Sequence, residues 1–450
     1  MPVLVDDDLL FEDERGLRPT TVVNQWLREL PTNGAPARNS WEYYARTARD
    51  WMEFLAGHGV ALFDTRARLK SALSSYAVYR SSGPLECRFE ASTWNQNMGI
   101  LGKLYRWAVA EGYADAEPFT YKQAIAYYGE RAAEMQVNQA RRRQAKAHVT
   151  IKYLEDDFAD LFINALSGLG PDGEDDTGYR GRELARNGAV GRFALSSGLR
   201  LQEFSYLLTC EVPRLPRRPT KVPLPLPVPA GVTKGRKFRV SWVDYPVLAG
   251  LHGYIDLERA LAADGSRWRP PASWGEPLIV TEADARGGRV NGTRVAWESL
   301  VPSERRRLVA PDGGSMLLAV RADGGPFTAW PTVFTRTSER IRERFEPRFP
   351  QVNPHRLRHT MAIRTLERLV RGYYAQVAQL VKDTDDDAAM ALYLTKTEPL
   401  LVLRDLLGHS SALTTEAYLN PRELHQMGEK SQVGSSREGR EALRSYYALA

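Results

Sequence analysis

The sequence predicts a mainly helical α+β protein with a small antiparallel β-sheet, and three patterns support this prediction. In several stretches apolar side chains recur every three or four residues, which is the period of a helix with one buried face. Residues 237–243 alternate like a β-strand. Proline occupies every second position over 223–229, which a central strand cannot accommodate, so we expect an edge strand or a polyproline segment there.

Length and composition limit the class of protein. The chain has 450 residues, too many for one ordinary hydrophobic core, so two or three domains are expected. Its hydrophobic fraction of 43% is typical of a globular protein. A net charge of +6 and a pI near 9.1 favour a nucleic-acid partner only slightly. The excess is mainly arginine, in runs such as 141–143 and 305–307, which suit solvated surface and phosphate contact about equally.

The cysteines and the apolar runs indicate the compartment. Cys87 and Cys210 lie far apart without metal-ligand spacing, which argues against a disulfide scaffold or a zinc site and favours a reducing cytoplasm. The N-terminus lacks the basic-then-apolar pattern of a signal peptide. No apolar run approaches the roughly 18 residues of a membrane helix. We therefore expect a soluble, cytoplasmic protein without a membrane partner.

The first 120 residues indicate an arm followed by a helical domain. Residues 1–38 show little periodicity and predict an extended N-terminal arm with one short helix around 22–30. An all-helical domain is predicted over 39–120, with helical patterns at 41–55, 69–79 and 92–112. The aromatic side chains of these patterns are most simply its core, rather than contacts to nucleic-acid bases.

Residues 121–150 are polar, helical in composition, and predict an interdomain linker with a basic end. That end supplies four candidate DNA contacts: Arg141, Arg142, Arg143 and Lys146.

A second domain is expected over 151–427, followed by a tail over 428–450 that ends in a short helix. The domain begins with helical patterns, changes to extended sequence after Arg200, and returns to helices near the C-terminus. The predicted helices are 153–166, 188–195, 330–345, 355–369, 400–407 and 414–419.

A first motif combines an arginine with a carboxylate. Gly198 breaks one helix, and apolar positions from Leu201 to Leu208 make the buried stripe of the next. Arg200 then lies on the first turn of that helix, with Glu203 one turn later to orient it.

A second motif lies at 233–239, where a glycine turn with lysines separates two extended segments. This pattern predicts a β-hairpin whose tip carries an ammonium group. Lys234 and Lys237 are the candidates for that group, and Lys237 is also a candidate DNA contact.

Two further motifs bring histidines into the same half of the chain. His355 and Arg358 are three residues apart, so a helix presents both on one face. His359 is expected on another face, in a structural or supporting role. His409 and Tyr418 follow a glycine that can end a helix.

This set contains no acid cluster or cysteine pair suited to a metal, but it suits phosphate chemistry. Arg200 and Arg358 are planar forks that can hold the charged oxygens of a phosphodiester. Tyrosine, with a reference pKa of about 10, attacks phosphorus readily only when a base removes its proton.

Each remaining side chain then has a candidate role. His355 is the candidate base for Tyr418, which would attack the phosphorus atom. Lys234 is the preferred candidate for protonating the leaving 5′-oxygen, with Lys237 as the alternative. His409 would donate a hydrogen bond to a phosphate oxygen.

Taken in order, the motifs Gly-Leu-Arg-x-x-Glu, Lys-Gly-x-Lys, His-x-Leu-Arg-His-Thr and Leu-Gly-His-Ser, with a tyrosine nine residues after the last histidine, resemble the tyrosine recombinase (phage integrase) family. The resemblance covers about residues 39–425. It implies a helical core-binding (SAM-like) domain, a C-terminal catalytic domain and no cofactor. The active site it implies consists of Arg200, Lys234, His355, Arg358, His409 and the nucleophile Tyr418, supported by Glu203.

The resemblance also implies an activity and partners. The chain would be a site-specific DNA recombinase or integrase from a mobile element, which cleaves and rejoins strands through a 3′-phosphotyrosyl intermediate. Its implied partners are double-stranded recombination sites, further copies of itself in a homotetramer, and an accessory excision factor, and it would lie on the nucleoid when bound to DNA. Two alternatives are a type IB topoisomerase-like enzyme and a DNA-binding relative with a degenerate site.

Two stretches, 244–329 and 370–397, are longer than compact members of the family need. The second contains an acidic cluster at 383–387, which we interpret as an exposed inserted loop rather than a metal site. Both inserts resemble those of integrase-like proteins from mobile elements.

Overall fold

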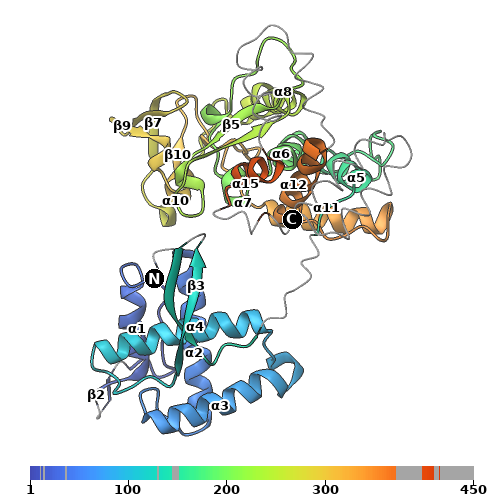
Figure 1. The fold of residues 1–450 in the computed structure, drawn as a ribbon. Helices are drawn as coiled ribbons and strands as arrows, with labels where there is room; N and C mark the ends of the chain where they lie inside the picture. Colours follow the sequence, from blue (N-terminus) through green and yellow to red (C-terminus); the bar gives the residue numbers. More distant parts are fainter. Residues whose placement is uncertain are drawn as a thin grey trace, which may run out of the picture. The chain divides into compact units, whose positions relative to one another are not determined.

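The computed structural model describes residues 1–10, 12–13, 16–35, 38–128, 131–143, 152–370, 398–409 and 415. The chain divides into two compact units, Met1–His148 and Val149–Ala450, which we call unit 1 and unit 2 (Figure 1). Both contain helices and small β-sheets, so the predicted mainly helical α+β class is confirmed. Within the described residues, no helix is long and apolar enough to cross a membrane.

Unit 1 is built around four helices and a long β-hairpin. The helices are α1 (Pro19–Glu29), α2 (Trp41–Gly57), α3 (Arg66–Ser82) and α4 (Ala91–Ala110). The strands are the short pair β1 (Glu12–Asp13) and β2 (Gly16–Leu17), and the hairpin β3 (Tyr121–Tyr128) and β4 (Arg131–Asn138).

The aromatic residues of unit 1 form its core, as the periodicity predicts. Trp51 and Tyr105 are fully buried, and the Trp51 Nε1–H donates to the Tyr105 hydroxyl over 2.9 Å. The hydroxyl of Tyr105 in turn donates to the Leu62 carbonyl over 2.8 Å. These polar tips are thus satisfied inside the core, which is what burial of tyrosine and tryptophan requires.

The predicted N-terminal arm differs from the structure in one respect. Helix α1 is packed into the unit 1 core, where Trp26 and Leu27 are buried, and it contacts α2 and α4. Its apolar positions Val22, Val23, Trp26 and Leu27 follow the three-to-four spacing of one helical face, so burying that face favours packing over an extended arm.

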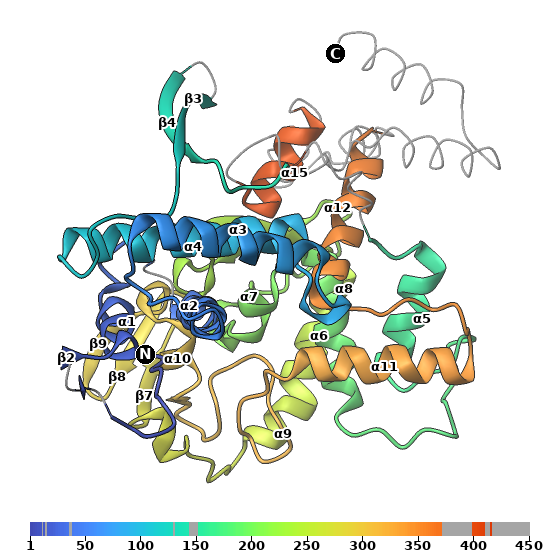
Figure 2. The ribbon, with the colours of Figure 1, turned by 90° about the horizontal axis from the view of Figure 1, so that it is seen from below.

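The predicted helical linker is also different. Residues 121–138 form the β3–β4 hairpin, which extends away from the unit 1 helices (Figure 2). Its register pairs Tyr121 with Asn138, and the amide of Gln139 continues the ladder to the Thr120 carbonyl over 2.9 Å. The tyrosines and isoleucine of β3 favour strand over helix, although the polar composition suggested a helix.

In unit 2, helices precede and follow the β-strands along the chain. The helices are α5 (Asp156–Leu166), α6 (Leu184–Ser197), α7 (Leu201–Ser205), α8 (Tyr245–Tyr254), α9 (Ala260–Ala263), α10 (Pro302–Arg305), α11 (Trp330–Arg344), α12 (Pro354–Val370) and α15 (Pro399–Leu407). Helix α6 contacts α5, α8 and α12 (Figure 2), and the main core includes Phe162, Phe193, Phe204 and Trp330.

The proline-rich segment forms the predicted edge strand. Strand β5 (Leu224–Val228) pairs antiparallel with β6 (Arg239–Val243) in a two-stranded sheet. Each strand of such a sheet has one open edge, so the missing N–H groups of Pro225 and Pro227 cost no ladder hydrogen bond where they face outward.

The stretch 244–329 adds a second, smaller core. Strands β7 (Leu278–Ala283), β8 (Gly287–Val290), β9 (Thr293–Ala296) and β10 (Leu308–Val309) form a sheet in the order β10-β7-β8-β9. The β10–β7 pair is parallel and the others are antiparallel. Its core includes Val280, Trp297 and Leu317. Apart from Val370, the last residue of α12, the predicted insert 370–397 lies outside the described residues, and so does the tail 428–450.

Candidate active site

The junction between α6 and α7 positions Arg200. Gly198 ends α6 with φ +60, and a Cβ at this position would lie 2.1 Å from the Met361 Cε, so a larger residue would be both strained and crowded. Arg200 precedes α7, and its backbone N–H donates to the Glu203 Oε2 over 2.7 Å. Its guanidinium Nη1 donates to the Glu203 Oε1 over 3.1 Å. Glu203 therefore orients Arg200, as the spacing predicts.

Glu203 is shared with a second arginine, Arg239 of β6. The Nη1 and Nη2 of Arg239 donate to the two carboxylate oxygens of Glu203 over 2.7 Å each, a bidentate pair. The Glu203 side chain is 1% exposed. Burial alone would raise the pKa of Glu203, but the hydrogen bonds and charge of Arg239, with those of Arg200, lower it below its ordinary value. The carboxylate is therefore ionised inside the protein.

Arg239 was not among the residues selected from the sequence, although a signal for it exists. Strand alternation places Arg239 on the same face as Ser241 and Val243, which are buried. An arginine on the buried face of a strand requires a buried partner, and that requirement points to a carboxylate such as Glu203.

Arg358 joins three segments of unit 2. It lies on α12 with 2% of its surface exposed. Its Nη1 donates to the Gly198 carbonyl at the end of α6 over 2.7 Å, and its Nη2 donates to the Leu407 carbonyl at the end of α15. The buried guanidinium therefore holds the α6 and α15 ends against α12.

The candidate histidines lie on elements that Arg358 joins, with His355 and His359 on α12 and His409 directly after α15. His355 lies one turn before Arg358 and is exposed, and its ring meets that of His359 edge-to-face at 4.2 Å between centroids. His409 follows Gly408, which ends α15 with φ +61, and the His409 amide donates to the Arg404 carbonyl over 3.1 Å.

The side chain of His409 has a defined partner. Its Nδ1 lies 3.0 Å from the hydroxyl oxygen of Thr415, which is fully buried. This contact engages Nδ1, and if the hydroxyl donates, Nε2 carries the proton. Thr415 was not predicted from the sequence, and its threonine type carries no signal of this role.

The electrostatics of the site come mainly from cations. Although the His355 side chain is exposed, partial desolvation of its ring, followed by the charges of Arg358 and Arg200, lowers its pKa. Burial, then Arg358, Arg200 and Arg239, lower the pKa of His409 to about 4. These couplings indicate that the arginines and histidines lie within electrostatic range of one another. The imidazoles are accordingly neutral at pH 7, and the surrounding charge favours an anionic ligand.

His359 belongs to the same group and is half-buried. Burial, followed by the charges of His355 and Arg358, lowers its pKa to about 4. Its ring packs against that of His355, four residues earlier, so both lie on the same face of α12 and the expectation of another face is wrong.

Lys234 and Lys237 lie on the turn before β6. The Thr233 hydroxyl closes this turn by accepting the Lys237 amide over 2.9 Å, and Gly235 has φ +82. Both lysine side chains are exposed, and within the described part of the chain neither makes a hydrogen bond or ion pair. The structure therefore brings together Arg200, Glu203, His355, Arg358 and His409, whereas Lys234 does not touch them. Tyr418 lies outside the described residues.

The candidate DNA contacts before residue 150 differ in exposure and in their contacts within unit 1. The Arg142 guanidinium lies 4.3 Å from the Trp94 ring centroid and donates to the Ala77 carbonyl over 2.7 Å. Its backbone exchanges hydrogen bonds with the side chain of Asn95. These contacts engage the half-buried Arg142 guanidinium within unit 1, and its predicted DNA contact stays a prediction. Arg141 and Arg143 are exposed, and Lys146 lies outside the described residues.

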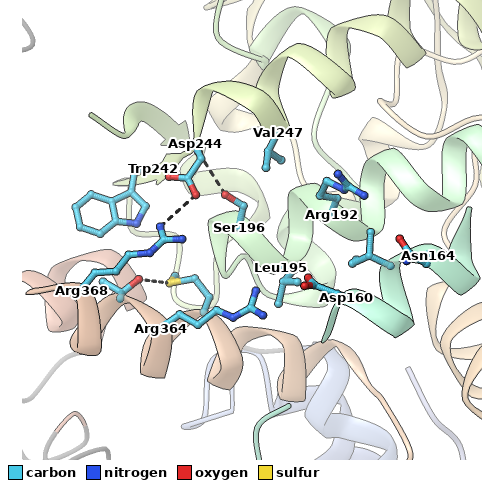
Figure 3. A pocket seen from close by; sticks show the side chains of 13 residues that line it. Asp160, Asn164, Arg192, Leu195, Ser196, Trp242, Asp244, Val247, Arg364 and Arg368 are labelled. Carbon is cyan, nitrogen blue, oxygen red and sulfur yellow. Dashed lines mark hydrogen bonds and ion pairs between the residues drawn. The ribbon is translucent and has the colours of Figure 1, made fainter. Parts of the chain in front are cut away.

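A pocket of about 400 Å³ lies beside the site (Figure 3). Its wall is formed by α5, α6, the end of β6 and the later turns of α12, with Arg192, Asp244 and Arg368 among the lining residues. Arg368 contacts Asp244 over 3.3 Å. None of the predicted site residues lines this pocket, so it is distinct from the arginine–histidine group.

Within the described residues, no group of three histidine, cysteine, aspartate or glutamate side chains has the arrangement of a metal site. The acidic cluster at 383–387 lies outside them.

Comparisons with known proteins give similarities of structure. No protein-family model matches the chain, and no curated protein matches it in sequence. The XerH site-specific recombinase, in a post-cleavage complex with a palindromic difH substrate, matches with 14% identity and a TM-score of 0.49, over 91% of this chain and 84% of that chain. The Tn1549 transposon integrase in complex with transposon right-end DNA matches with 12% identity and a TM-score of 0.49, over 95% and 99%. The XerA recombinase matches with 14% identity and a TM-score of 0.31, over 91% and 98%. The solved structures that this chain is similar to are thus site-specific recombinases and a transposon integrase.

Proposed function

We propose that this chain is a site-specific DNA recombinase of the tyrosine type, which cleaves and rejoins DNA strands. The observation that carries the proposal is the exposed face of Arg200. Its side chain is 32% exposed, it is held by the buried carboxylate of Glu203, and it lies within electrostatic range of His355 and His409. Such a fixed, accessible guanidinium among neutral imidazoles suits a phosphodiester.

The phosphate would be held from two sides. Arg200 would contact the non-bridging oxygens from the solvent side, and Arg358 would support the site from beneath, where it is anchored to two backbone carbonyls. Donors fixed before the reaction stabilise the charge of a phosphoryl transition state without further reorganisation. His409 would complete this cradle by donating a hydrogen bond to a phosphate oxygen.

The chemical step would use a tyrosine. The Tyr418 phenol oxygen would attack phosphorus as His355 accepts its proton, and the bond from phosphorus to the 5′-oxygen would break. The leaving 5′-oxygen would take a proton from Lys234 on its exposed turn. A 3′-phosphotyrosyl link would remain, and a 5′-hydroxyl of another strand would reverse the step. No cofactor is required for this exchange.

Partners follow from the same proposal. The substrate would be double-stranded DNA with specific recombination sites, contacted in part by Arg141, Arg143, Lys146 and Lys237. Exchange between two duplexes requires four strand-cleaving subunits, so a homotetramer on DNA is proposed, with an accessory excision factor and a location at the nucleoid.

The alternative of a type IB topoisomerase-like enzyme would use the same chemistry on one duplex. Relaxation of supercoiled plasmid without any exchange product would favour it. A DNA-binding relative with a degenerate site would bind DNA but form no covalent product.

The test is to trap the covalent product on nicked duplexes drawn from the DNA flanking the gene. Wild-type protein is expected to form a protein–DNA adduct, and mass spectrometry should locate it on the peptide that contains Tyr418. Tyr418→Phe is expected to abolish the adduct while the dissociation constant for DNA is unchanged, because only the attacking oxygen is lost. An adduct formed by Tyr418→Phe would show that another residue is the nucleophile.

A further inference from the structure

We propose that Arg239 is a positioning residue that holds Arg200 and the turn carrying His409 in one arrangement. The expected effect of Arg239 on DNA cleavage rests on the proposed function. The contacts themselves are independent of it.

Arg239 connects three segments that are far apart in the sequence. It begins β6, its two Nη atoms bind the Glu203 carboxylate of α7 over 2.7 Å each, and its Nε donates to the Leu406 carbonyl of α15 over 3.1 Å. The Arg239 side chain is 9% exposed and that of Glu203 is 1% exposed. The planar fork can satisfy both partners at once, which the single ammonium group of lysine cannot do.

On one side, Arg239 determines where Arg200 points. The Glu203 Oε1 accepts from the Nη1 of both arginines, and its Oε2 accepts from the Arg239 Nη2 and the Arg200 amide. Both carboxylate oxygens are thus shared between the two arginines. Because Arg239 fixes the plane of the carboxylate, it also fixes the direction of the Arg200 guanidinium.

On the other side, Arg239 supports the turn that carries His409. The Leu406 carbonyl lies in the last turn of α15, and the next carbonyl, that of Leu407, accepts from Arg358. Two successive carbonyls are therefore held by arginines from β6 and α12. A Cβ at Gly408 would lie 2.7 Å from the Arg239 Cδ, so the side chain packs directly beneath the residue that precedes His409.

The first measurement separates positioning from binding. Single-turnover cleavage of a nicked substrate at saturating DNA, and the dissociation constant for DNA, are compared in wild type, Arg239→Gln and Arg239→Lys. Both variants are expected to cleave about 10²-fold more slowly, as for a misplacement of about 1 Å, with the dissociation constant unchanged. The control is Arg404→Gln, which removes a half-buried arginine from α15, the helix whose Leu406 carbonyl Arg239 contacts, and is expected to cleave at the wild-type rate.

The second measurement does not depend on activity. The amides of Gly408 and His409 donate to the Asp405 and Arg404 carbonyls, and their hydrogen exchange reports the order of the turn. Both Arg239 variants are expected to increase this exchange, whereas Arg404→Gln should not. Gly408→Ala places a methyl group against the Arg239 side chain and should also increase the hydrogen exchange of these amides. This variant tests the same contact if Arg239→Gln does not fold.

The outcomes are distinct. Full cleavage by Arg239→Lys would overturn the proposal, because charge alone would then suffice. Unchanged exchange at Gly408 and His409 in folded Arg239 variants would also overturn it. If wild-type protein forms no adduct on any nicked duplex, the proposed function fails, and the exchange measurement still decides whether Arg239 holds the turn.

Discussion

Unit 2 contains two buried arginine–carboxylate clusters of similar chemistry and different accessibility. In the smaller core, Arg305 is fully buried and pairs with Glu211 over 2.6 and 2.8 Å. Its remaining N–H groups donate to the carbonyls of Leu300, Tyr206 and Trp297. In the candidate site, Glu203 is equally buried, but one of its two arginines, Arg200, is 32% exposed.

The difference shows how a structural cluster is distinguished from a candidate site. Arg305 has a partner for each of its five donors, so nothing remains for a ligand. The guanidinium of Arg200 donates to one carboxylate oxygen of Glu203, and 32% of the Arg200 side chain is exposed. Whether a basic run such as 305–307 contacts phosphate or has another role could therefore be decided only from its contacts. Those contacts show that Arg305 is structural.

The largest expected effect concerns the fully buried Arg305–Glu211 cluster. Arg305→Met would leave the buried Glu211 carboxylate without its partner, and we expect a loss of about 3–5 kcal/mol in the free energy of unfolding. Urea unfolding measures this loss, and Arg306→Met, next along the chain and stacked on Trp274, is the control. Below the unfolding transition, the folded variant should cleave DNA at the wild-type rate. Slow cleavage by fully folded Arg305→Met would erase the distinction between the two clusters.

In the partly exposed cluster of Arg200, Glu203 and Arg239, we expect a substitution of Arg200 to change the cleavage rate rather than the stability. Arg200→Ala is expected to slow adduct formation by about 10²–10³-fold, because one preorganised donor to the transition-state oxygens is lost. Its free energy of unfolding should change little, since the side chain is partly exposed. Arg192→Ala, which removes an exposed arginine of α6, is the matched control and should cleave normally. A large loss of stability without a loss of rate in Arg200→Ala would assign it a structural role.

A smaller effect is expected at the exposed turn. Lys234→Ala should slow cleavage by about 10²-fold, within the usual contribution of a general acid. On a substrate with sulfur at the 5′-bridging position, whose leaving group needs no proton, the loss should be much smaller. Equal losses on both substrates would exclude Lys234 as the acid, and Lys237→Ala tests the neighbouring candidate in the same way.

A separate effect concerns the pH dependence of stability. The pKa values of His359 and His409 are about 4 in the folded protein, below the ordinary value of 6.5, mainly because burial disfavours the charged form. The unfolded chain therefore binds more protons between these values, so stability should fall as the pH decreases from about 6.5 to about 4. Urea midpoints at several pH values measure the slope, and His359→Asn should reduce it. An unchanged slope in that variant would show that groups other than His359 cause the pH dependence of stability.

Parts of the fold were predictable because they depend on neighbours in sequence. Periodicity indicated the core aromatics of α2 and α4, and alternation indicated β6, since each pattern reflects one buried face. The hairpin at 121–138 was missed because its polar composition fits a helix or a strand. The packing of α1 was missed because periodicity predicts a buried face without saying which core it joins.

The sequence by itself determined the local parts of the candidate site: the Arg200–Glu203 pair, the His355–Arg358 turn and the glycine before His409. Each depends on spacings of one to three residues, which backbone geometry converts directly into contacts. Only the tertiary structure decided that Arg239 meets Glu203 and that Arg358 reaches the Leu407 carbonyl. It also decided that Arg142 lies over the Trp94 ring and that Arg305 pairs with Glu211. Those contacts join residues separated by between 36 and 94 positions, with Arg305 and Glu211 at the upper end. Packing of whole elements, rather than any local preference, brings such residues together.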